Sequence, residues 1–331
     1  MKSNNYLLIS LLGLILGCGK LEKINPTIQI YPEFGTRTKI PKQDTSYVLI
    51  PDVNFENKLI ELKIDDKQDG KLLKLNAKNV TRLELRGLGI ATLRGIEAFE
   101  NIEYLFADYN YLTEVDLSKN LRLEHLYLSD NQLTLVDVSK NKILGSLGLY
   151  NNKLTSLDVS KNDHLYYLEC SENQLTSLIL GQQNELLQLE AVKNKLKEID
   201  LNKAPNLRML NIYKNQLQSI DVSNNRELYY LYVSDNQLKE LSVENNIKLE
   251  RFGFRNNQIE KINVSNNPLL ADFVVEGNKL KYLDVRKNPN LVYFWCDANT
   301  IQTICVSSMS QIKPTWKKDP TANYELCEPS I

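Results

Sequence analysis

The stretch LEHLYLSDNQLTLVDVSKNKI, residues 123–143, is one copy of a pattern that recurs every 21 residues through most of this chain. Apolar residues fill its first, fourth, sixth and eleventh positions, and Asn fills its ninth. Ten copies follow one another without insertion, and they begin at Ile102, Leu123, Leu144, Leu165, Leu186, Leu207, Leu228, Leu249, Leu270 and Leu291. A fixed period of this length predicts a solenoid, in which each copy packs only against its neighbours.

The two halves of each copy predict different local structures. The first half alternates apolar and variable residues, as in LRMLNI at 207–212, which predicts a short strand with one buried side. Stacked strands, about 4.8 Å apart, would form a parallel sheet on the concave side of a horseshoe, on the order of 50 Å long. The second half, such as LTSLDVS at 154–160, is too short for a regular α-helix. We therefore expect a mostly β, α/β-type solenoid with short extended or 3₁₀ segments on the convex side.

The ninth position is Asn in every copy: Asn110, Asn131, Asn152, Asn173, Asn194, Asn215, Asn236, Asn257, Asn278 and Asn299. An exposed polar residue would vary among Ser, Lys and Glu. An unvarying Asn indicates a buried amide whose donor and acceptor both serve backbone groups where the strand turns away. Stacked copies predict a ladder of such amides.

These repeats resemble the leucine-rich repeat family. The period and the LTxLDVSxN second half look most like the internalin J-like 21-residue repeats of Bacteroidetes-type surface lipoproteins. In those relatives Cys often occupies the sixth position and forms a buried thiol ladder, whereas here only Cys170 and Cys296 stand in that slot. The resemblance covers residues 47–327 and implies the fold. It leaves the ligand open, because such repeats host many partners.

The start of the chain is typical of an exported lipoprotein. Residues 1–17 place Lys2 before an apolar run from Tyr6 to Leu16, which predicts a signal peptide. This run is shorter than the about 20 residues that a membrane-spanning helix needs. The sequence ILGC at 15–18 resembles the bacterial lipobox, which implies that Cys18 is acylated and anchors the protein to the outer membrane or cell surface. The alternative is an ordinary secretory signal, with Cys18 discarded or free.

Two segments separate this signal from the ten copies. Residues 18–46 are rich in Pro and lack periodicity, so we predict a flexible tether. Residues 47–101 are predicted to form an N-terminal cap, with a helix starting at Asp52, and an atypical 22-residue first repeat at 80–101. Together they would cover the first open strand edge.

Within this cap, DDKQDGKLLKLN at 65–76 resembles a calcium loop that has lost two carboxylates, at Lys67 and Asn76. The alternative is a turn fixed by Gly70.

The last copy departs from the pattern. Cys305 stands where most copies carry Asp or another polar residue, and Cys327 follows 22 residues later. Because an exported chain is disulfide-permissive, we predict a Cys305–Cys327 bond that fixes a C-terminal cap at 311–331. Closing this loop is worth about 3 kcal/mol in the chain-entropy model. Cys170 and Cys296 are expected to stay reduced in the core.

Composition and motifs argue against several classes of function. Forty Lys and Arg balance 41 Asp and Glu, which disfavours nucleic-acid binding, since that needs a basic face. There is no Gly-rich phosphate loop, and His125 and His164, the two histidines, have no partner at metal-ligand spacing. We therefore expect a protein that is not an enzyme, with no catalytic residues, metal site or cofactor.

Function is expected where the copies differ, at the strand positions that alternation directs to the concave face. Many of these are aromatic, and Tyr and Trp combine apolar area with a polar tip. The candidate partner-binding residues are Tyr104, Phe106, Tyr109, Tyr127, Tyr150, Tyr167, Tyr213, Tyr230, Tyr232, Arg251, Tyr293 and Trp295. Strands favour Tyr in general, so packing alone is the alternative explanation.

Adjacency predicts two clusters on this face. The first consists of Tyr104, Phe106, Tyr109, His125 and Tyr127. The second consists of Tyr213, Tyr229, Tyr230, Tyr232, Arg251 and Arg255, a mixture suited to an anionic or aromatic partner. An acidic stretch lies between them: Glu169, Glu172 and Glu190. Gly148 and Gly253 are expected to leave shallow hollows beside Tyr127 and Tyr232.

The predicted function is that of a non-enzymatic, monomeric, lipid-anchored envelope or cell-surface protein. It would bind a protein partner through the concave face, in adhesion or host-cell interaction, and meet a membrane only through its lipid. Ten strands present more than the roughly 20–30 residues of a standard interface. Two alternatives stay open: glycan recognition, with tyrosines stacked on sugar rings, and a mainly structural envelope role.

Overall fold

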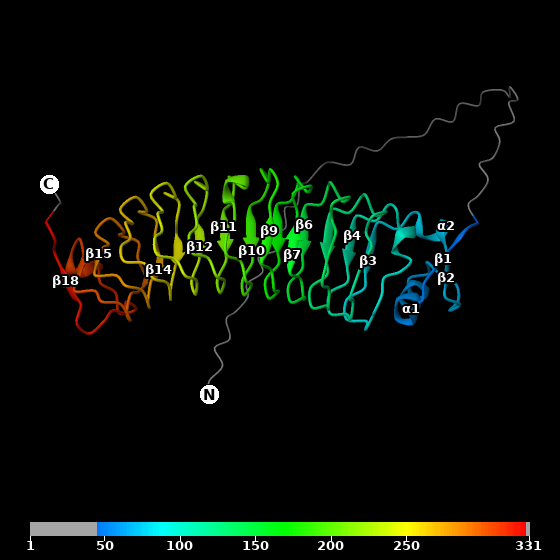
Figure 1. The fold of residues 1–331 in the computed structure, drawn as a ribbon, viewed down its shortest axis with the longest axis horizontal. Helices are drawn as coiled ribbons and strands as arrows, with labels where there is room; N and C mark the ends of the chain where they lie inside the picture. The colour runs from blue at the N-terminus through cyan, green and yellow to red at the C-terminus, as the bar shows by residue number, and fades with distance from the viewer. Residues whose placement is uncertain (1–44, 329–331) are drawn as a thin grey trace, which may run out of the picture. The chain divides into compact units, whose positions relative to one another are not determined.

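A computed structural model of the protein describes residues 45–328, whose turns stack side by side along one axis (Figure 1). The predicted signal peptide, Cys18 and nearly all of the predicted tether lie outside the described residues. Among residues 45–328, no helix has the length and apolar character of a membrane span.

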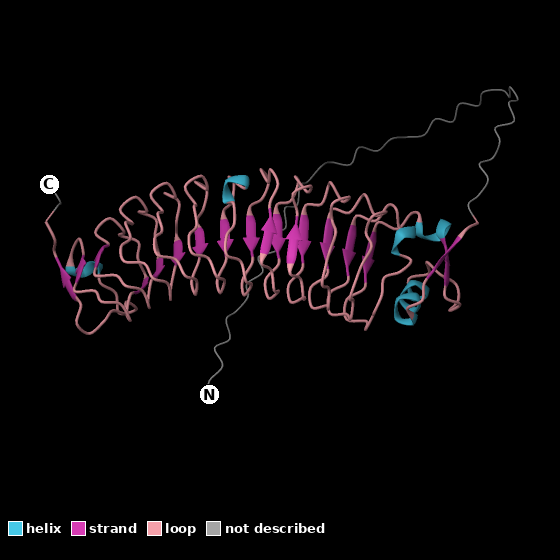
Figure 2. Cartoon of the chain, in the orientation of Figure 1, coloured by secondary structure: helices cyan, strands magenta, loops and turns pink. Residues whose placement is uncertain are grey.

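The main sheet has 11 strands, one from the atypical first repeat and one from each 21-residue copy (Figure 2). In spatial order they are β3 (Arg82–Glu84), β4 (Tyr104–Phe106), β5 (His125–Tyr127), β6 (Ser146–Gly148), β8 (Tyr167–Glu169), β10 (Gln188–Glu190), β11 (Met209–Asn211), β12 (Tyr230–Tyr232), β13 (Arg251–Gly253), β14 (Asp272–Val274) and β16 (Tyr293–Trp295). All neighbours are parallel. The predicted parallel sheet is confirmed.

Each strand buries its middle residue and turns the other two away from the core. In β8 and β10 the middle residues Leu168 and Leu189 face each other in register, and both are fully buried. A slip of one residue would move these leucines to the outward face, so the core sets the register. The residues at the first and third strand positions therefore form two columns along the sheet.

The opposite side of the coil is built from short extended pieces and single 3₁₀ turns, as the second half of the repeat predicts. Strands β7 (Ser156–Asp158) and β9 (Ser177–Ile179) form one small sheet. A second small sheet contains β15 (Tyr282–Asp284), β17 (Thr303–Cys305) and β18 (Asn323–Glu325). The 3₁₀ helices are η1 (Ile96–Ala98), η2 (Leu201–Lys203) and η3 (Met309–Gln311).

The core fills the space between these two sides. One copy contributes Leu165, Leu168, Cys170 and Leu175, each fully buried, and burying a side chain of leucine size is worth about 1.5–3 kcal/mol. Toward the C-terminal end the middle strand residues become Phe, and Phe273 stacks on Phe294 with ring centroids 5.6 Å apart. Since the apolar residues of one copy face those of the next, the repeats are stable only as a stack.

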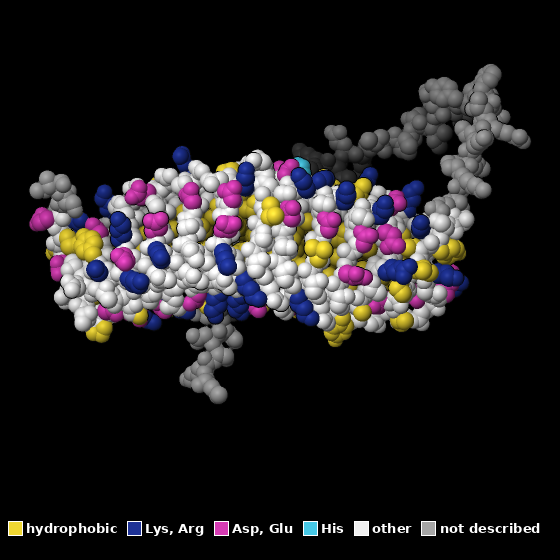
Figure 3. Space-filling model, in the orientation of Figure 1, with side chains coloured by type: hydrophobic (Ala, Val, Ile, Leu, Met, Phe, Trp, Pro, Cys, Tyr) yellow, Lys and Arg dark blue, Asp and Glu magenta, His cyan; other side chains and the backbone are white. Residues whose placement is uncertain are grey.

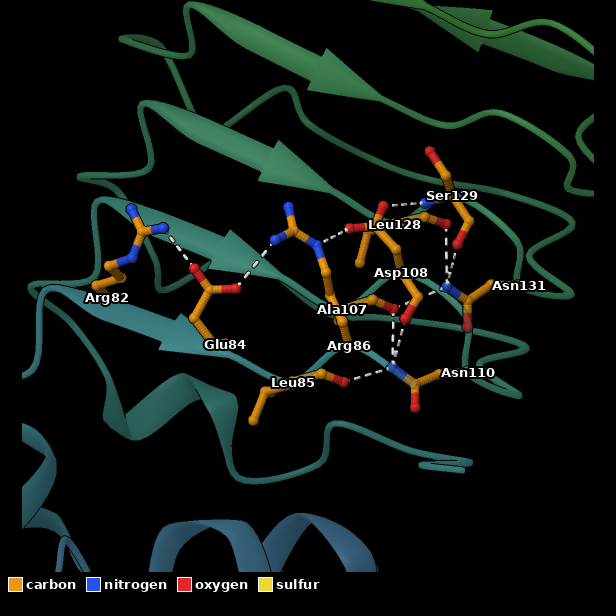
Figure 4. Close-up of polar contacts among 10 residues, drawn as sticks. All are labelled: Arg82, Glu84, Leu85, Arg86, Ala107, Asp108, Asn110, Leu128, Ser129 and Asn131. Carbon is orange, nitrogen blue, oxygen red and sulfur yellow. Dashed lines mark hydrogen bonds and ion pairs between the residues drawn. The ribbon is translucent and has the colours of Figure 1, made fainter. Parts of the chain in front are cut away.

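The predicted ladder of ninth-position asparagines, called the inner ladder from here on, is confirmed. Asn131 is buried, and its Oδ1 accepts the Leu112 N–H at 3.0 Å. Its Nδ2 donates to the carbonyls of Ala107 and Leu128 (Figure 4). The same bonds recur in the other copies, for example at Asn194. Each amide thus joins two successive turns of backbone.

A second file of amides, the outer ladder, occupies the nineteenth repeat position, and sequence reasoning missed it. Its members are Asn120, Asn141, Asn162, Gln183, Asn225, Asn246, Asn267 and Asn288, all with no exposed surface. Asn141 donates to the carbonyls of Leu117 and Asn120. The side-chain oxygen of every member has no hydrogen-bond partner in the described structure. The signal was present in the pattern, because Asn also dominates this position.

The residue before each inner-ladder Asn adopts a left-handed backbone. Its φ lies between 50° and 58° wherever it is not Gly, as at Tyr109, Glu172 and Lys193, and Gly277 has φ 67°. Such a conformation is uncommon outside Gly. Its recurrence shows that the turn out of the main sheet has one geometry throughout.

At the N-terminal end, α1 (Val53–Glu61) follows its N-cap Asp52, whose Oδ1 accepts the N–H groups of Asn54 and Phe55. The other oxygen of Asp52 accepts the Ala91 N–H at 2.7 Å, which ties the helix to the first repeat. Strands β1 (Tyr47–Leu49) and β2 (Lys71–Leu73) pair antiparallel, and α2 (Lys74–Ala77) follows.

The first half of the calcium-like stretch, residues 65–70, bends into β2, and its second half belongs to β2 and α2. Gly70 has φ 75°, a conformation that glycine adopts readily. The buried Glu56 accepts the N–H groups of Asp69 and Gly70, and Lys67 pairs with Asp69 at 2.9 Å. Among residues 45–328 no group of three or more His, Cys, Asp or Glu side chains is placed to hold a metal ion.

At the C-terminal end the predicted Cys305–Cys327 disulfide is present, with the two Cα atoms 5.4 Å apart. Arg286 donates to the carbonyls of Cys327 and Glu328 and so holds the same segment. Cys170 and Cys296 are free and buried, which confirms their predicted place in the core.

Candidate partner-binding face

The sheet face consists of the outward residues at the first and third positions of the 11 main strands. It contains nine of the predicted partner-binding residues: Tyr104, Phe106, Tyr127, Tyr167, Tyr230, Tyr232, Arg251, Tyr293 and Trp295. Tyr150 and Tyr213 lie just beyond the ends of their strands. Tyr109 sits in the left-handed turn, 66% exposed, so it belongs to the rim and not to the first cluster.

The N-terminal cluster comprises Arg82, Tyr104, Phe106, His125 and Tyr127. Side chains at the same register lie one strand spacing apart, so their rings stack. Tyr104 and His125 stack at 4.6 Å, and Phe106 and Tyr127 stack at 5.2 Å with their planes 4° apart. The guanidinium of Arg82 lies 4.5 Å from the Phe106 centroid. The ring faces are thereby largely covered by one another and by cations.

The cations of this cluster are paired within the protein. Figure 4 shows a chain of contacts from Arg82 through Glu84 and Arg86 to Asp108. Asp108 also accepts the Ser129 N–H at 2.9 Å. The network links three neighbouring turns and balances the positive charge.

The C-terminal cluster comprises Tyr230, Tyr232, Arg251 and Arg255. The two tyrosine rings lie 4.5 Å apart, and burial raises the pKa of Tyr232 to about 12. Arg251 pairs with Asp272 at 3.4 Å, and Arg255 pairs with Glu276 at 3.2 Å. The sequence suggested an anionic partner here, but the positive charge is already balanced.

The hollows expected at Gly148 and Gly253 are absent. A Cβ added at Gly148 would lie 2.6 Å from the ring of Tyr127, and one at Gly253 would lie 2.8 Å from the ring of Tyr232. Both glycines are buried. Each tyrosine leans across the neighbouring strand because the glycine there leaves room, so the glycines make the face flatter.

The middle of the sheet face is acidic. Glu169 and Glu190 are direct register partners on β8 and β10. Glu169 accepts the Ser171 N–H at 2.7 Å, and Glu190 accepts from Gln188 Nε2 at 2.5 Å. Burial, together with the neighbouring Glu190 carboxyl, raises the pKa of Glu169 to about 7. The predicted third member, Glu172, lies instead in a left-handed turn and pairs with Lys193.

Trp295 belongs partly to the C-terminal cap. Its Nε1 donates to the Thr315 carbonyl at 3.2 Å, and Lys317 Nζ lies 4.0 Å from its ring centroid. Tyr293, on the same strand, is 48% exposed, so Tyr293 is the better placed of the two to meet a partner.

A groove at the rim before the strands was not foreseen from the sequence. It encloses about 310 Å³ and is lined by residues that include both histidines, Tyr166 and Glu185. His164 Nδ1 lies 3.2 Å from Glu185 Oε1, and the Tyr166 ring rests over Gly145. His125 and His164 occupy different repeat positions, which is why spacing alone did not bring them together.

Neither a protein-family model nor a curated protein sequence matches the chain. Solved structures do match. The functional domain of InlJ from Listeria monocytogenes has a TM-score of 0.64 and 25% identity, covering 87% of this chain and 73% of that one. YopM from Yersinia pestis has a TM-score of 0.63 and 22% identity, covering 87% and 80%. The internalin InlF from Listeria monocytogenes has a TM-score of 0.61 and 21% identity, covering 83% and 96%.

The protein has an internalin-like leucine-rich repeat fold.

The InlJ domain is described as including a cysteine ladder. In this leucine-rich repeat solenoid, the sixth repeat position holds Cys only at Cys170 and Cys296, and other copies fill it with residues such as Leu128 and Ala191, all fully buried. The slot therefore requires an apolar side chain that fits the core and does not require a thiol.

On the face shown in Figure 3, acidic and basic side chains are interspersed along the solenoid, with hydrophobic side chains among them. This distribution agrees with the formal net charge of −1. The local charge on the sheet face is therefore a more informative guide to a partner than the overall charge.

Proposed function

We propose that this leucine-rich repeat protein is an exported, lipid-anchored, non-enzymatic binding protein whose sheet face takes a protein partner. The observation that carries the proposal is the alignment of nine predicted aromatic and charged residues on one continuous sheet. Two outward residues from each of 11 strands give a surface comparable to the roughly 20–30 residues per side of a standard interface.

A protein partner is favoured over a glycan by the arrangement of the rings. Stacking on a sugar needs a free aromatic face. In the N-terminal cluster, Phe106 lies between Arg82 and Tyr127, and Tyr104 is stacked on His125. These side chains keep part of their surface exposed, and the Tyr127 hydroxyl is bonded to the Ser146 hydroxyl at 2.6 Å. Such a surface suits the mixed apolar and polar contacts of a protein interface. Other solenoids of this fold have been solved in complexes with protein or peptide partners, which supports the proposal by analogy of fold.

The binding proposal is tested by crosslinking capture from intact cells. The full-length protein is compared with a Tyr230→Ala, Tyr232→Ala variant and with a Tyr47→Ala, Tyr111→Ala control. The control tyrosines are 59% and 61% exposed and lie off the main sheet. We expect the sheet variant to lose the captured protein by about tenfold or more, while the control keeps it. Equal capture by all three, with each folded by circular dichroism, would count against this face and favour a structural envelope role.

The anchor proposal rests on Cys18 alone and has its own test. Mass spectrometry of the mature N-terminus should find acylated Cys18, and a Cys18→Ser variant should leave the membrane fraction. A mature chain that starts elsewhere, or lacks lipid, would replace the anchor with an ordinary secretory signal.

A further inference from the structure

The charges on the sheet face are balanced everywhere except at its centre. Four strand residues of this face are carboxylates: Glu84, Glu169, Glu190 and Asp272. Glu84 pairs with Arg82 and Arg86, and Asp272 pairs with Arg251. Within residues 45–328, neither Glu169 nor Glu190 has a cationic partner within ion-pair distance.

The two unpaired carboxylates are also held together. Glu169 and Glu190 stand opposite each other on adjacent parallel strands, about 4.8 Å apart in the hydrogen-bonding direction. Like charges in this arrangement destabilise a sheet. The Ser171 N–H and the Gln188 amide each hold one of these carboxylates in place. The fold thus keeps a repulsive pair in a fixed geometry at the centre of its face.

The surroundings of the pair suit a positive charge. Tyr167 precedes Glu169 on the same strand, and the charges of both glutamates act on its hydroxyl. The charge of Glu190 also acts on the Tyr230 hydroxyl. On the side of β6 the register partner is Gly148, and on the side of β11 it is Asn211, so neither neighbour adds a competing cation. Carboxylates beside tyrosines are the common setting for ammonium and guanidinium groups.

We propose that Glu169 and Glu190 together receive one cationic side chain, an arginine guanidinium or a lysine ammonium, of the protein partner. This inference rests on the proposed function and specifies its chemistry. A planar guanidinium can bond two carboxylates at once, which makes arginine the better fit. A bare divalent ion fits less well, because calcium takes 6–8 oxygen ligands and the described residues place no group of three such side chains.

Cation binding should depend on pH. Near neutral pH the pair holds a proton, because burial and the mutual repulsion of the carboxylates raise the pKa of Glu169 to about 7. An incoming cation must displace that proton, so its affinity should fall as the solution is acidified. The groups nearest the pair are the register neighbours Gly148 and Asn211, the first strand residues Tyr167 and Gln188, and Ser171, which donates to Glu169. The charges of both glutamates also act on the buried Cys170 thiol, and that of Glu190 acts on Tyr230. The Glu172–Lys193 ion pair lies at the rim.

The test uses fluorescein-labelled tetra-arginine as the probe and fluorescence anisotropy as the readout, at about 0.15 M salt. The mature full chain is compared with Glu169→Gln, Glu190→Gln and with a Glu240→Gln, Glu260→Gln control, which removes the same charge from two exposed residues off the main sheet. We expect the sheet variant to bind about tenfold more weakly or worse, and the control to bind as the wild type does. We also expect wild-type affinity to fall between pH 8 and pH 5.5, with no such fall in the sheet variant.

Equal weakening in the two variants, or none in the sheet variant, would overturn the proposal. The change from Glu to Gln keeps the side-chain shape, and the single Glu190→Gln variant provides a milder version if the double variant folds poorly.

Partner capture separates this inference from the proposed function. If Tyr230→Ala, Tyr232→Ala loses the partner but Glu169→Gln, Glu190→Gln retains it fully, the cation site is wrong and the binding face stands. If neither variant reduces capture, the proposed function itself fails.

Discussion

The inner and outer ladders are built from the same residue and behave differently. Each inner Asn uses both ends of its amide, as Asn194 does with the N–H of Leu175 and the carbonyls of Cys170 and Ala191. Each outer Asn uses only its donor end, and its oxygen has no partner in the described structure. The inner position is Asn in all ten copies, whereas the outer ladder admits Gln183 and is interrupted by Ala204.

The difference indicates where the fold tolerates change. Replacing an inner Asn would leave a buried N–H unpaired and remove one of two amide donors from each of two carbonyls, as at Cys170 and Ala191. Replacing an outer one only removes a donor from carbonyls that keep a backbone donor. The inner ladder lies directly beside the strands that carry the sheet face. The protein therefore keeps its most completely bonded backbone next to its proposed binding surface.

The largest effect is expected from Asn194→Ala in the inner ladder. The Leu175 N–H loses its partner at about 1–3 kcal/mol, and the Cys170 and Ala191 carbonyls each lose one of two amide donors at about 1 kcal/mol. The free energy of unfolding should therefore fall by on the order of 3–5 kcal/mol. Urea unfolding followed by circular dichroism measures the loss. A loss below about 1 kcal/mol would mean that water replaces the amide easily, and the contrast between the ladders would disappear.

The second-largest effect is expected from reducing the Cys305–Cys327 bond, which joins β17 to the final segment at the C-terminal end. Reducing this bond should cost about 3 kcal/mol in the chain-entropy model. Hydrogen exchange should then rise across residues 303–327 and stay unchanged in β4 to β12, because repeat stability is local. Faster exchange throughout the main sheet would show that the cap stabilises the whole solenoid.

A smaller effect is expected from Asn162→Ala in the outer ladder. The carbonyls of Val138 and Asn141 lose a donor, but the unpartnered Asn oxygen is removed as well, so the loss should be about 1–2 kcal/mol. The side chain removed is the same as in Asn194→Ala, which makes the two variants a matched pair in the same urea experiment. Equal losses of stability in the two variants would show that the hydrogen bond accepted by the Asn194 Oδ1 contributes nothing.

The smallest effect, and the one that depends on pH, is expected from Glu169→Gln on the sheet face. Because the folded protein raises the pKa of Glu169 to about 7, above its ordinary value of about 4.3, ionising this group weakens the folded state. The stability that protonated Glu169 contributes to the wild type is fully present below the ordinary pKa and is lost as the pH rises through about 7. Gln cannot ionise, so the variant should be more stable than wild type at pH 8 by about 1 kcal/mol.

Melting temperatures at pH 5 and pH 8 check this, with Glu240→Gln as the control. At pH 5 the variant and wild type should melt together. If the variant melted at a higher temperature than wild type by the same amount at pH 5 and pH 8, packing and not charge would explain the effect.

Much of the fold was predictable because the same 21-residue pattern occurs ten times within one chain. The period, the middle leucine of each strand and the unvarying ninth Asn all report local environments that every copy shares. The Cys305–Cys327 pairing was predictable for the opposite reason, since Cys305 interrupts an otherwise regular position. The candidate face was predictable as a set of positions, but the contacts within it were not.

The contacts that escaped prediction depend on what the neighbouring turn places alongside. Tyr127 covers Gly148 because the two stand on adjacent strands, Arg251 is neutralised by Asp272 one copy later, and Tyr109 leaves the sheet because its backbone turns left-handed. The outer-ladder oxygens also escaped prediction, because the sequence does not show which donors lie near them.

The sequence by itself determined the solenoid, its parallel register, the buried amide of each copy and the disulfide at its end. The first three features follow from periodicity, because equivalent positions of successive repeats pack against one another. The disulfide follows from Cys305, which interrupts that periodicity. Only the tertiary structure decided which charges on the sheet face are balanced. That balance depends in part on side chains that meet across strands, as Arg251 and Asp272 do from 21 residues apart. It left Glu169 and Glu190 as the one pair without a cation on the sheet face.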